Sequence, residues 1–171
     1  MIFRSRVACM TVINTSPAVH LHAVLPGGIA LLPRLVGEVI IPWEVNQELA
    51  AGHEKDDAWR QIQAVPGLML RQMPVKVHPL ISSQIDAGEA AVVQTAVDEG
   101  LKTVILDDLK ARRIATALGL AVTGTLGILV QAKLTGHLSS VRGAIAALER
   151  RGMWITPALA AQAARLAGES A

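Results

Sequence analysis

The chain has 171 residues, 51% of them apolar, with 16 lysine and arginine residues against 14 aspartate and glutamate residues. This length and apolar content suit one folded domain with a substantial core and argue against a disordered chain. A single cysteine, Cys9, excludes a disulfide scaffold and the cysteine-rich zinc modules. The few aromatic residues argue against recognition of bases on an aromatic platform, and Trp43, Trp59 and Trp154 are expected in the core or at an interface.

The charges are divided unevenly along the chain. Residues 1–108 contain 8 basic and 12 acidic side chains, whereas residues 109–171 contain 8 basic and 2 acidic ones. A basic C-terminal third can attract a polyanion such as a nucleic acid. The alternative is that these lysine and arginine residues only solvate exposed helix faces.

No segment predicts export or membrane insertion. The apolar run after Arg4 and Arg6 is too short for a signal sequence. Residues 119–130 are interrupted by glycine and threonine and fall short of the roughly 20 residues that a membrane span needs. We therefore expect a cytoplasmic protein without membrane contact. Residues 1–9 are expected to be an N-terminal extension, because Met10 directly precedes the first predicted strand and is itself a candidate start.

Short β-branched runs alternate with helical patterns along the chain. The first half predicts a strand at residues 11–14, helices at 15–25 and 29–36, a strand at 38–41, helices at 42–51 and 56–65, and an edge strand at 68–71. The second half predicts a helix at residues 88–99, a strand at 102–106, a helix at 109–118, a strand at 120–123, and helices at 125–135, 139–151 and 157–167. Three prolines make residues 66–80 the expected insertion or flexible segment.

This alternation predicts the fold class. Strands joined by helices form a parallel sheet with helices on both faces, because each connection must return the chain to the same edge of the sheet. We therefore expect one α/β domain with three layers (α/β/α) and a helical C-terminal end. The core is expected to consist of alanine, valine, leucine and isoleucine, since alanine alone occurs 27 times.

Polar side chains stand where the predicted strands end or where the following helices begin. In chain order they are Asn14, Thr15, Ser16, Glu44, Glu48, Glu89, Asp107, Asp108, Thr123 and Thr125. The carboxyl ends of parallel strands lie at one edge of the sheet, where α/β proteins bind their ligands. We therefore expect these side chains to converge on one pocket.

Acidic groups at such an edge point to a hard cation. Adjacent carboxylates are costly to bury unless a cation neutralises them. The ligands on offer are oxygen atoms and the histidines are scattered, so the expected ion is Mg²⁺ or Mn²⁺. Enzymes that hydrolyse phosphodiester bonds commonly bind one or two such ions between several carboxylates. The basic residues Lys110, Arg112 and Arg113 are candidates to hold the substrate phosphates.

Each of these residues also has a structural interpretation. Glu89 can be an acid favoured by the N-terminal dipole of its helix, and Glu48 can be a solvated helix residue. Asp107 or Asp108 can cap the helix that starts at Leu109. The three basic residues can form a solvated helix face. Only the placement of these groups at successive strand ends favours a common site.

As an ordered set, the motifs resemble the PIN-domain family, the metal-dependent ribonuclease fold of VapC-like toxins. The closest likeness is to an uncharacterised prokaryotic branch of predicted nucleic-acid-binding PIN proteins. The segments that carry the resemblance are residues 12–17, 31–35, 37–42, 45, 48–49, 87–90, 104–108, 111–115 and 120–127. The likeness spans residues 10–169, which implies a single PIN-like domain over nearly the whole chain.

The resemblance implies a set of site residues. The positions that match the acids of PIN domains are Asn14, Glu48, Glu89 and Asp108. Asp107 is an interchangeable neighbour of Asp108, and Glu44 is an alternative to Glu48 one turn earlier on the helix. The expected metal ligands are Asn14, Glu89, Asp107 and Asp108. Hydroxyls that would orient metal-bound water or a phosphate fall at Thr15, Ser16, Thr123 and Thr125.

The resemblance also implies an activity and partners: a ribonuclease with one or two Mg²⁺ or Mn²⁺ ions that acts on RNA as a homodimeric toxin paired with an antitoxin protein. Asn14 departs from the usual first aspartate of the family. Its amide oxygen can bind a hard cation but brings no negative charge, which should weaken divalent binding. The alternative is therefore a catalytically weakened PIN-fold protein that binds RNA or a protein partner without hydrolysis.

Overall fold

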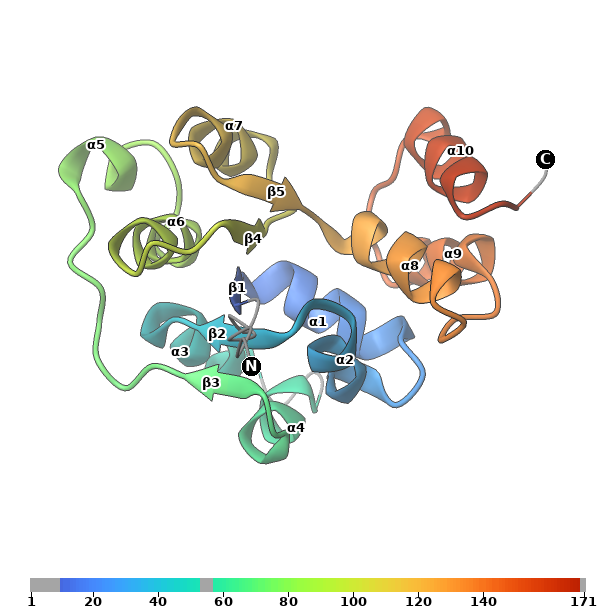
Figure 1. The fold of residues 1–171 in the computed structure, drawn as a ribbon, viewed down its shortest axis with the longest axis horizontal. Coiled ribbons are helices and arrows are strands. Elements are labelled where there is room, and N and C mark those ends of the chain that lie inside the picture. The colour runs from blue at the N-terminus through green and yellow to red at the C-terminus, as the bar shows by residue number, and fades with distance from the viewer. Residues whose placement is uncertain (1–9, 53–56, 170–171) are drawn as a thin grey trace, which may run out of the picture.

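The computed structural model describes residues 10–52 and 57–169. These residues form a five-stranded parallel sheet flanked by helices, with the strand order β3-β2-β1-β4-β5 (Figure 1). The predicted N-terminal extension at residues 1–9 and the predicted start of a helix at Asp56 lie outside the described residues.

All five predicted strands are confirmed. They are β1 (Met10–Ile13), β2 (Glu38–Ile41), β3 (Leu68–Leu70), β4 (Thr103–Ile105) and β5 (Ala121–Thr123). Every neighbouring pair is parallel, and Ile13, Ile105 and Thr123 are in register at the carboxyl ends of three adjacent strands. The residues that follow these strands are therefore brought together at one edge of the sheet.

The helices also follow the predicted order. They are α1 (Thr15–Val24), α2 (Leu32–Val36), α3 (Trp43–Gly52), α4 (Ala58–Ala64), α5 (Pro79–Ser82), α6 (Ala87–Asp98), α7 (Leu109–Ala117), α8 (Thr125–Leu134), α9 (Val141–Arg150) and α10 (Pro157–Leu166). The helix predicted at residues 29–36 is instead a 3-10 turn, η1 (Gly28–Leu31), followed by α2, with Pro33 in the first turn of α2. The one-turn helix α5 was not predicted, because four residues carry too little periodicity to be recognised.

The helices cover the sheet on both faces. α3, α6 and α7 pack side by side on one face, and α1, α2 and α8 lie on the other (Figure 1). α9 and α10 pack on α8 and on each other, which gives the helical C-terminal end. The three-layer α/β/α architecture predicted from the sequence is confirmed. Within the described residues no single helix is long and apolar enough to cross a membrane, although the bent pair Thr15–Val24 and Gly28–Val36 passes that length and composition test together.

The core explains why the strands are apolar at consecutive positions. Side chains from the centre of β1, β2 and β4 point alternately to the two faces, and both faces are covered by helices. The apolar strand residues with at most 1% exposure are Val12, Ile13, Val39, Ile40, Ile41, Val104 and Ile105. Trp59 packs against this core, whereas Trp154 is 83% exposed and lies outside it, so that of the two predicted positions only an interface remains for Trp154.

The C-terminal helices are joined by a carboxylate. Glu169, which follows α10, accepts hydrogen bonds from the backbone N–H groups of Val141 (2.6 Å) and Arg142 (3.0 Å) at the start of α9. Lys133 of α8 lies 3.7 Å from the same carboxylate. Ser140 is the N-cap of α9 and accepts from the Gly143 N–H (3.0 Å), so Glu169 adds a second set of acceptors to this helix start and connects α8, α9 and α10.

This arrangement predicts a stability cost for Glu169→Ala. Two backbone donors at the start of α9 lose their acceptor, so the free energy of unfolding should fall by about 1–2 kcal/mol. Urea unfolding followed by circular dichroism measures the change. Glu149→Ala, which alters an exposed glutamate near the other end of the same helix, is the matched control and should be nearly neutral. Equal effects of the two substitutions would show that the Glu169 cap contributes nothing.

Candidate active site

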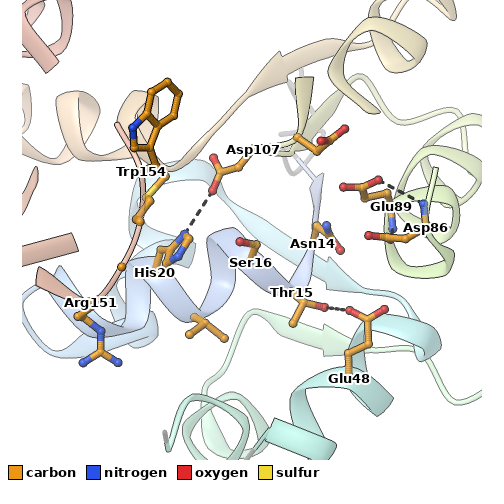
Figure 2. A pocket seen from close by; sticks show the side chains of 14 residues that line it. Asn14, Thr15, Ser16, His20, Glu48, Asp86, Glu89, Asp107, Arg151 and Trp154 are labelled. Carbon is orange, nitrogen blue, oxygen red and sulfur yellow. Dashed lines mark hydrogen bonds and ion pairs between the residues drawn. The ribbon is translucent and has the colours of Figure 1, made fainter. Parts of the chain in front are cut away.

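A cavity of about 800 Å³ lies at the carboxyl edge of the sheet (Figure 2). Its lining residues come from the ends of β1 and β4, from α1, α3 and the start of α6, and from the loop after α9; they are Asn14, Thr15, Ser16, Val19, His20, Glu48, Asp86, Glu89, Asp107, Asp108, Arg151, Gly152, Met153 and Trp154. Seven of these residues were singled out in the sequence, and the structure brings them into one pocket.

Asn14 is the first residue after β1. Its backbone N–H donates to the carbonyl of Ile105 (3.2 Å), which continues the pairing of β1 with β4 by one residue. The Asn14 side chain is 7% exposed, and its Oδ1 atom has no hydrogen-bond partner among the described residues. A buried oxygen without a donor is destabilising, so this atom calls for a ligand that it can bind.

Gly88 allows two of the side-chain oxygens to approach the start of α6. A Cβ atom at this position would lie 2.6 Å from Glu48 Oε1 and 3.0 Å from Asn14 Oδ1. Both oxygens therefore occupy the space beside the same glycine. The hydroxyl of Thr15 donates to Glu48 Oε2 and holds this carboxylate against the end of β1 (Figure 2).

Glu89 lies in a reciprocal capping box at the start of α6. The Glu89 N–H donates to Asp86 Oδ1 (2.8 Å), and the Asp86 N–H approaches Glu89 Oε2 (3.4 Å). Glu89 is only 8% exposed. Burial, followed by repulsion from Asp86, Asp108 and Glu48, raises the pKa of Glu89 to about 7. Glu89 is thus both the helix-terminal acid of the structural interpretation and part of a crowded acidic cluster.

Asp108 also combines two roles. Its Oδ1 atom accepts hydrogen bonds from the N–H groups of Lys110 (2.8 Å) and Ala111 (2.9 Å), so Asp108 caps α7. The alternative structural interpretation of this residue is therefore correct. The same carboxylate lines the cavity, and its Oδ2 atom makes no hydrogen bond within the described parts of the chain. One oxygen of Asp108 belongs to the helix, and the other remains for a ligand.

Asp107 has different partners from Asp108. Its two oxygens accept hydrogen bonds from the N–H (2.7 Å) and the hydroxyl (2.6 Å) of Thr125, and His20 Nδ1 lies 3.5 Å away (Figure 2). Burial raises the pKa of Asp107, but the contacts with His20 and Thr125 outweigh burial and hold the pKa below its ordinary value. Both oxygens are already engaged, so Asp107 and Asp108 are not equivalent neighbours.

Several residues singled out in the sequence lie outside the cavity lining. Thr125 is fully buried against Asp107, and Thr123 Oγ1 lies beside Gly127 of α8. Glu44 accepts a hydrogen bond from the Val75 N–H (2.8 Å) instead of reaching the cavity, so Glu48 is the helix acid that lines it.

The predicted phosphate-binding residues of α7 also lie outside the cavity lining. Arg112 donates from Nη1 to the Leu106 carbonyl (2.8 Å) and is half-buried, which gives it a structural contact. Lys110 and Arg113 are exposed on α7 and do not line the cavity. Arg151 is the basic residue that does line it.

Sequence reasoning did not assign the other seven lining residues to the site: Val19, His20, Asp86, Arg151, Gly152, Met153 and Trp154. Asp86 had a readable signal, because an aspartate three residues before a glutamate at a helix start is a capping-box pattern. His20 lies one turn after Ser16 on the same helix face. Arg151, Met153 and Trp154 belong to a loop after a helix, to which the strand-end argument does not apply.

The donor set of the cavity fits a hard divalent cation. The amide oxygen of Asn14 and the carboxylates of Glu48, Glu89 and Asp108 are oxygen ligands of the kind that Mg²⁺ and Mn²⁺ prefer. The buried Oδ1 atom of Asn14, which has no partner among the described residues, is available as such a ligand. The fit lies in the kind of ligand, because no group of three or more His, Cys, Asp or Glu side chains in the described ranges is spaced to hold a metal ion as it stands.

The raised pKa of Glu89 predicts how stability depends on pH. The folded-state pKa of about 7 exceeds the ordinary value of 4.5, so between these pH values the folded state binds a proton that the unfolded state has lost. The free energy of unfolding of the metal-free protein should therefore decrease as the pH rises through this range. Glu89→Gln should flatten the slope, and Asp108→Asn should lower the Glu89 pKa measured by NMR titration. A Glu89 pKa near 4.5 in the metal-free protein would contradict the electrostatic picture of the pocket.

Comparison with known proteins agrees with this geometry. A family model described as a PIN domain matches residues 10–169. No curated protein matches the chain. The match covers all five strands and every element that lines the cavity, and it supports nuclease-like and nucleic-acid-binding function at a coarse level. The chain therefore belongs to the PIN-domain family.

Proposed function

We propose that the protein is a metal-dependent ribonuclease that hydrolyses RNA phosphodiester bonds at the acidic cavity. The observation that carries the proposal is the buried, unpartnered Oδ1 atom of Asn14 beside the carboxylate of Glu48, where only the absence of a side chain at Gly88 leaves room for both oxygens. Glu89 and Asp108 complete the acidic cluster. Membership of the PIN-domain family supports nuclease-like chemistry.

The residues of the cavity divide the work. Asn14, Glu48, Glu89 and Asp108 would hold the ion, one or two Mg²⁺ or Mn²⁺. The bound ion would activate water and offset the charge that develops on the phosphate oxygens. Thr15 holds the Glu48 carboxylate in place by its hydroxyl.

Two further residues organise the cavity around this cluster. Asp107, with both oxygens engaged by Thr125, positions the imidazole of His20. Arg151 supplies a positive charge for a phosphate at the rim. Lys110 and Arg113 remain candidates for contacts with phosphates farther along the RNA, because they are exposed on the helix that follows Asp108.

Cleavage of RNA in Mn²⁺ tests the proposal. Glu89→Ala removes a carboxylate from the centre of the cluster, so the cleavage rate should fall about 100-fold or more. Glu38→Ala changes an exposed glutamate at the amino end of β2, far from the carboxyl edge, and should leave the rate unchanged. EDTA should abolish cleavage by the wild type. Cleavage that persists in Glu89→Ala would rule out this site.

A second function is favoured by one observation, the amide in place of a carboxylate at Asn14. The cluster then offers one negative charge fewer to the ion than four acids would, which should weaken divalent binding. A protein that binds RNA or a protein partner without hydrolysis does not need the missing charge. Asn14→Asp separates the two functions. In a working or dormant nuclease the substitution should tighten Mn²⁺ binding, measured by calorimetry, and raise the cleavage rate. Tighter Mn²⁺ binding without any gain in cleavage would favour the binding protein.

The proposal extends to the setting of the enzyme, as the resemblance to VapC-like toxins implies. In this setting the protein is cytoplasmic, pairs with an antitoxin protein and forms a homodimer. The exposed leucines Leu134, Leu159 and Leu166 on α8 and α10 support an interface at the C-terminal helices. A neighbouring gene that encodes a small antitoxin-like protein would support the toxin role.

A further inference from the structure

Trp154 is an exposed aromatic side chain at the rim of the acidic cavity. It is 83% exposed, the largest exposed fraction among the large apolar residues that the structure describes. The chain has only three tryptophans, one phenylalanine and no tyrosine, so an aromatic ring in solvent is unusual here. Trp154 nevertheless lines the same cavity as Asn14 and Glu89.

The backbone around Trp154 is fixed, although the side chain is exposed. α9 ends in a Schellman motif, in which Gly152 has φ +93° and the N–H groups of Gly152 and Met153 donate to the carbonyls of Glu149 (2.9 Å) and Leu148 (3.0 Å). On the other side Ile155 is buried in the core, and Thr156 caps α10 through the Leu159 N–H (3.2 Å).

The neighbours of Trp154 also determine the direction of its ring. Met153 and Ile155, on either side of Trp154, both pack against the core. The Trp154 side chain between them is 83% exposed and is therefore directed outward. The ring is therefore held in solvent by its anchored neighbours, which makes it a ready surface for a flat ligand.

The surroundings of the ring indicate what such a ligand must carry. Arg151, three residues earlier in the same loop, gives this side of the cavity a positive charge. Figure 2 shows Trp154 and Arg151 on the side of His20 and Asp107, across the cavity from Glu48 and Glu89. A ligand that spans the cavity would thus meet an aromatic face and a guanidinium at one end and the carboxylate cluster at the other.

We propose that Trp154 is the stacking platform for an unpaired base of single-stranded RNA, next to the phosphate that enters the acidic cavity. The base would lie on the indole face, and Arg151 would contact the phosphate attached to it. Every nucleobase has a flat face that stacks on an aromatic ring, and Arg binds phosphate through two parallel N–H donors. This inference rests on the proposed function and deepens it, because it selects single strands over duplexes.

Two features favour a nucleotide over a protein partner at this position. The other lining residues near Trp154 are charged, polar or glycine apart from the partly buried Met153 and Val19, so no broad apolar patch surrounds the ring. The exposed leucines of α8 and α10 do not line the cavity. In duplex RNA the bases already stack on one another and are unavailable, which is the basis of the expected selectivity.

Binding of RNA tests the inference independently of cleavage. The probes are a fluorescein-labelled dodecamer of adenylate, the same strand with abasic sites at its centre, and a duplex of the same length, each measured by anisotropy in Ca²⁺ and in EDTA. Trp154→Ala should weaken binding of the intact strand by roughly 10-fold, while Trp154→Phe should retain most of the affinity. Leu80→Ala, which alters an exposed apolar residue of α5 outside the cavity lining, is the matched control and should have no effect.

The abasic strand separates base stacking from binding that does not depend on the bases. It should bind the wild type about as weakly as the intact strand binds Trp154→Ala, and Trp154→Ala should not distinguish the two strands. Equal affinity of wild type and Trp154→Ala for the intact strand, equal losses for the intact and abasic strands, or no binding by the wild type would overturn the inference.

The outcomes also separate this inference from the proposed ribonuclease. If Mn²⁺-dependent cleavage is lost in Glu89→Ala but RNA binding is unchanged in Trp154→Ala, the nuclease stands and the stacking role fails. If the wild type does not cleave RNA but its binding depends on Trp154 and on the base, the stacking role stands and hydrolysis fails. Binding of a protein partner that is lost in Trp154→Ala, with unchanged RNA affinity, would assign the ring to a protein interface instead.

Discussion

Carboxylates that repel one another at one edge of a parallel sheet are the constraint on which this structure depends. Glu89 is buried beside Asp86, Asp108 and Glu48, and their repulsion together with burial raises its pKa to about 7. Such a cluster is unfavourable unless each acid has another partner. Thr15, the start of α6 and the start of α7 supply those partners, so the acids are held by helix starts and by a hydroxyl rather than by basic side chains.

The two adjacent aspartates at the end of β4 have different hydrogen-bond partners and different roles. Both oxygens of Asp107 accept hydrogen bonds from Thr125, and Asp107 faces His20. One oxygen of Asp108 accepts the hydrogen bonds that cap α7, and its other oxygen faces the cavity. Asp107 therefore ties the end of β4 to the start of α8. Asp108 and Asn14 both line the cavity and are the groups of the central strands that we propose to bind the cation. The contacts with His20 and Thr125 outweigh burial and lower the pKa of Asp107, whereas burial and then the neighbouring carboxylates raise the pKa of Glu89.

The sequence predicted most of the fold because the signals are local. Buried β-branched runs and helix caps are read within a few residues, and all five strands and the long helices follow from them. The rule about strand ends in parallel sheets predicted that polar groups converge at one edge, and the resemblance to PIN domains selected Asn14, Glu48, Glu89 and Asp108 among them. The features that could not be predicted are the side-chain contacts between residues far apart in the sequence.

The residues missed or misplaced share that dependence on tertiary structure. Thr125 stands at a position where a site hydroxyl was expected, but its hydroxyl donates a hydrogen bond to Asp107. Arg112 was a candidate for phosphate binding, but its guanidinium donates to the carbonyl of Leu106. Trp154 enters the cavity rim only because α9 folds back beside α1 and α8. The low aromatic content argued against stacking on a platform of several rings. The composition could not show that a single ring, that of Trp154, lies at the cavity rim.

The central claim is that Asn14, Glu48, Glu89 and Asp108 bind a divalent cation. Anomalous diffraction from a crystal soaked in Mn²⁺ at a pH above 7 tests it most directly. The account predicts an anomalous peak in the cavity about 2.1 Å from Asn14 Oδ1 and from oxygens of the carboxylates. A well-ordered cavity without a peak, or a peak bound only by other residues, would contradict it.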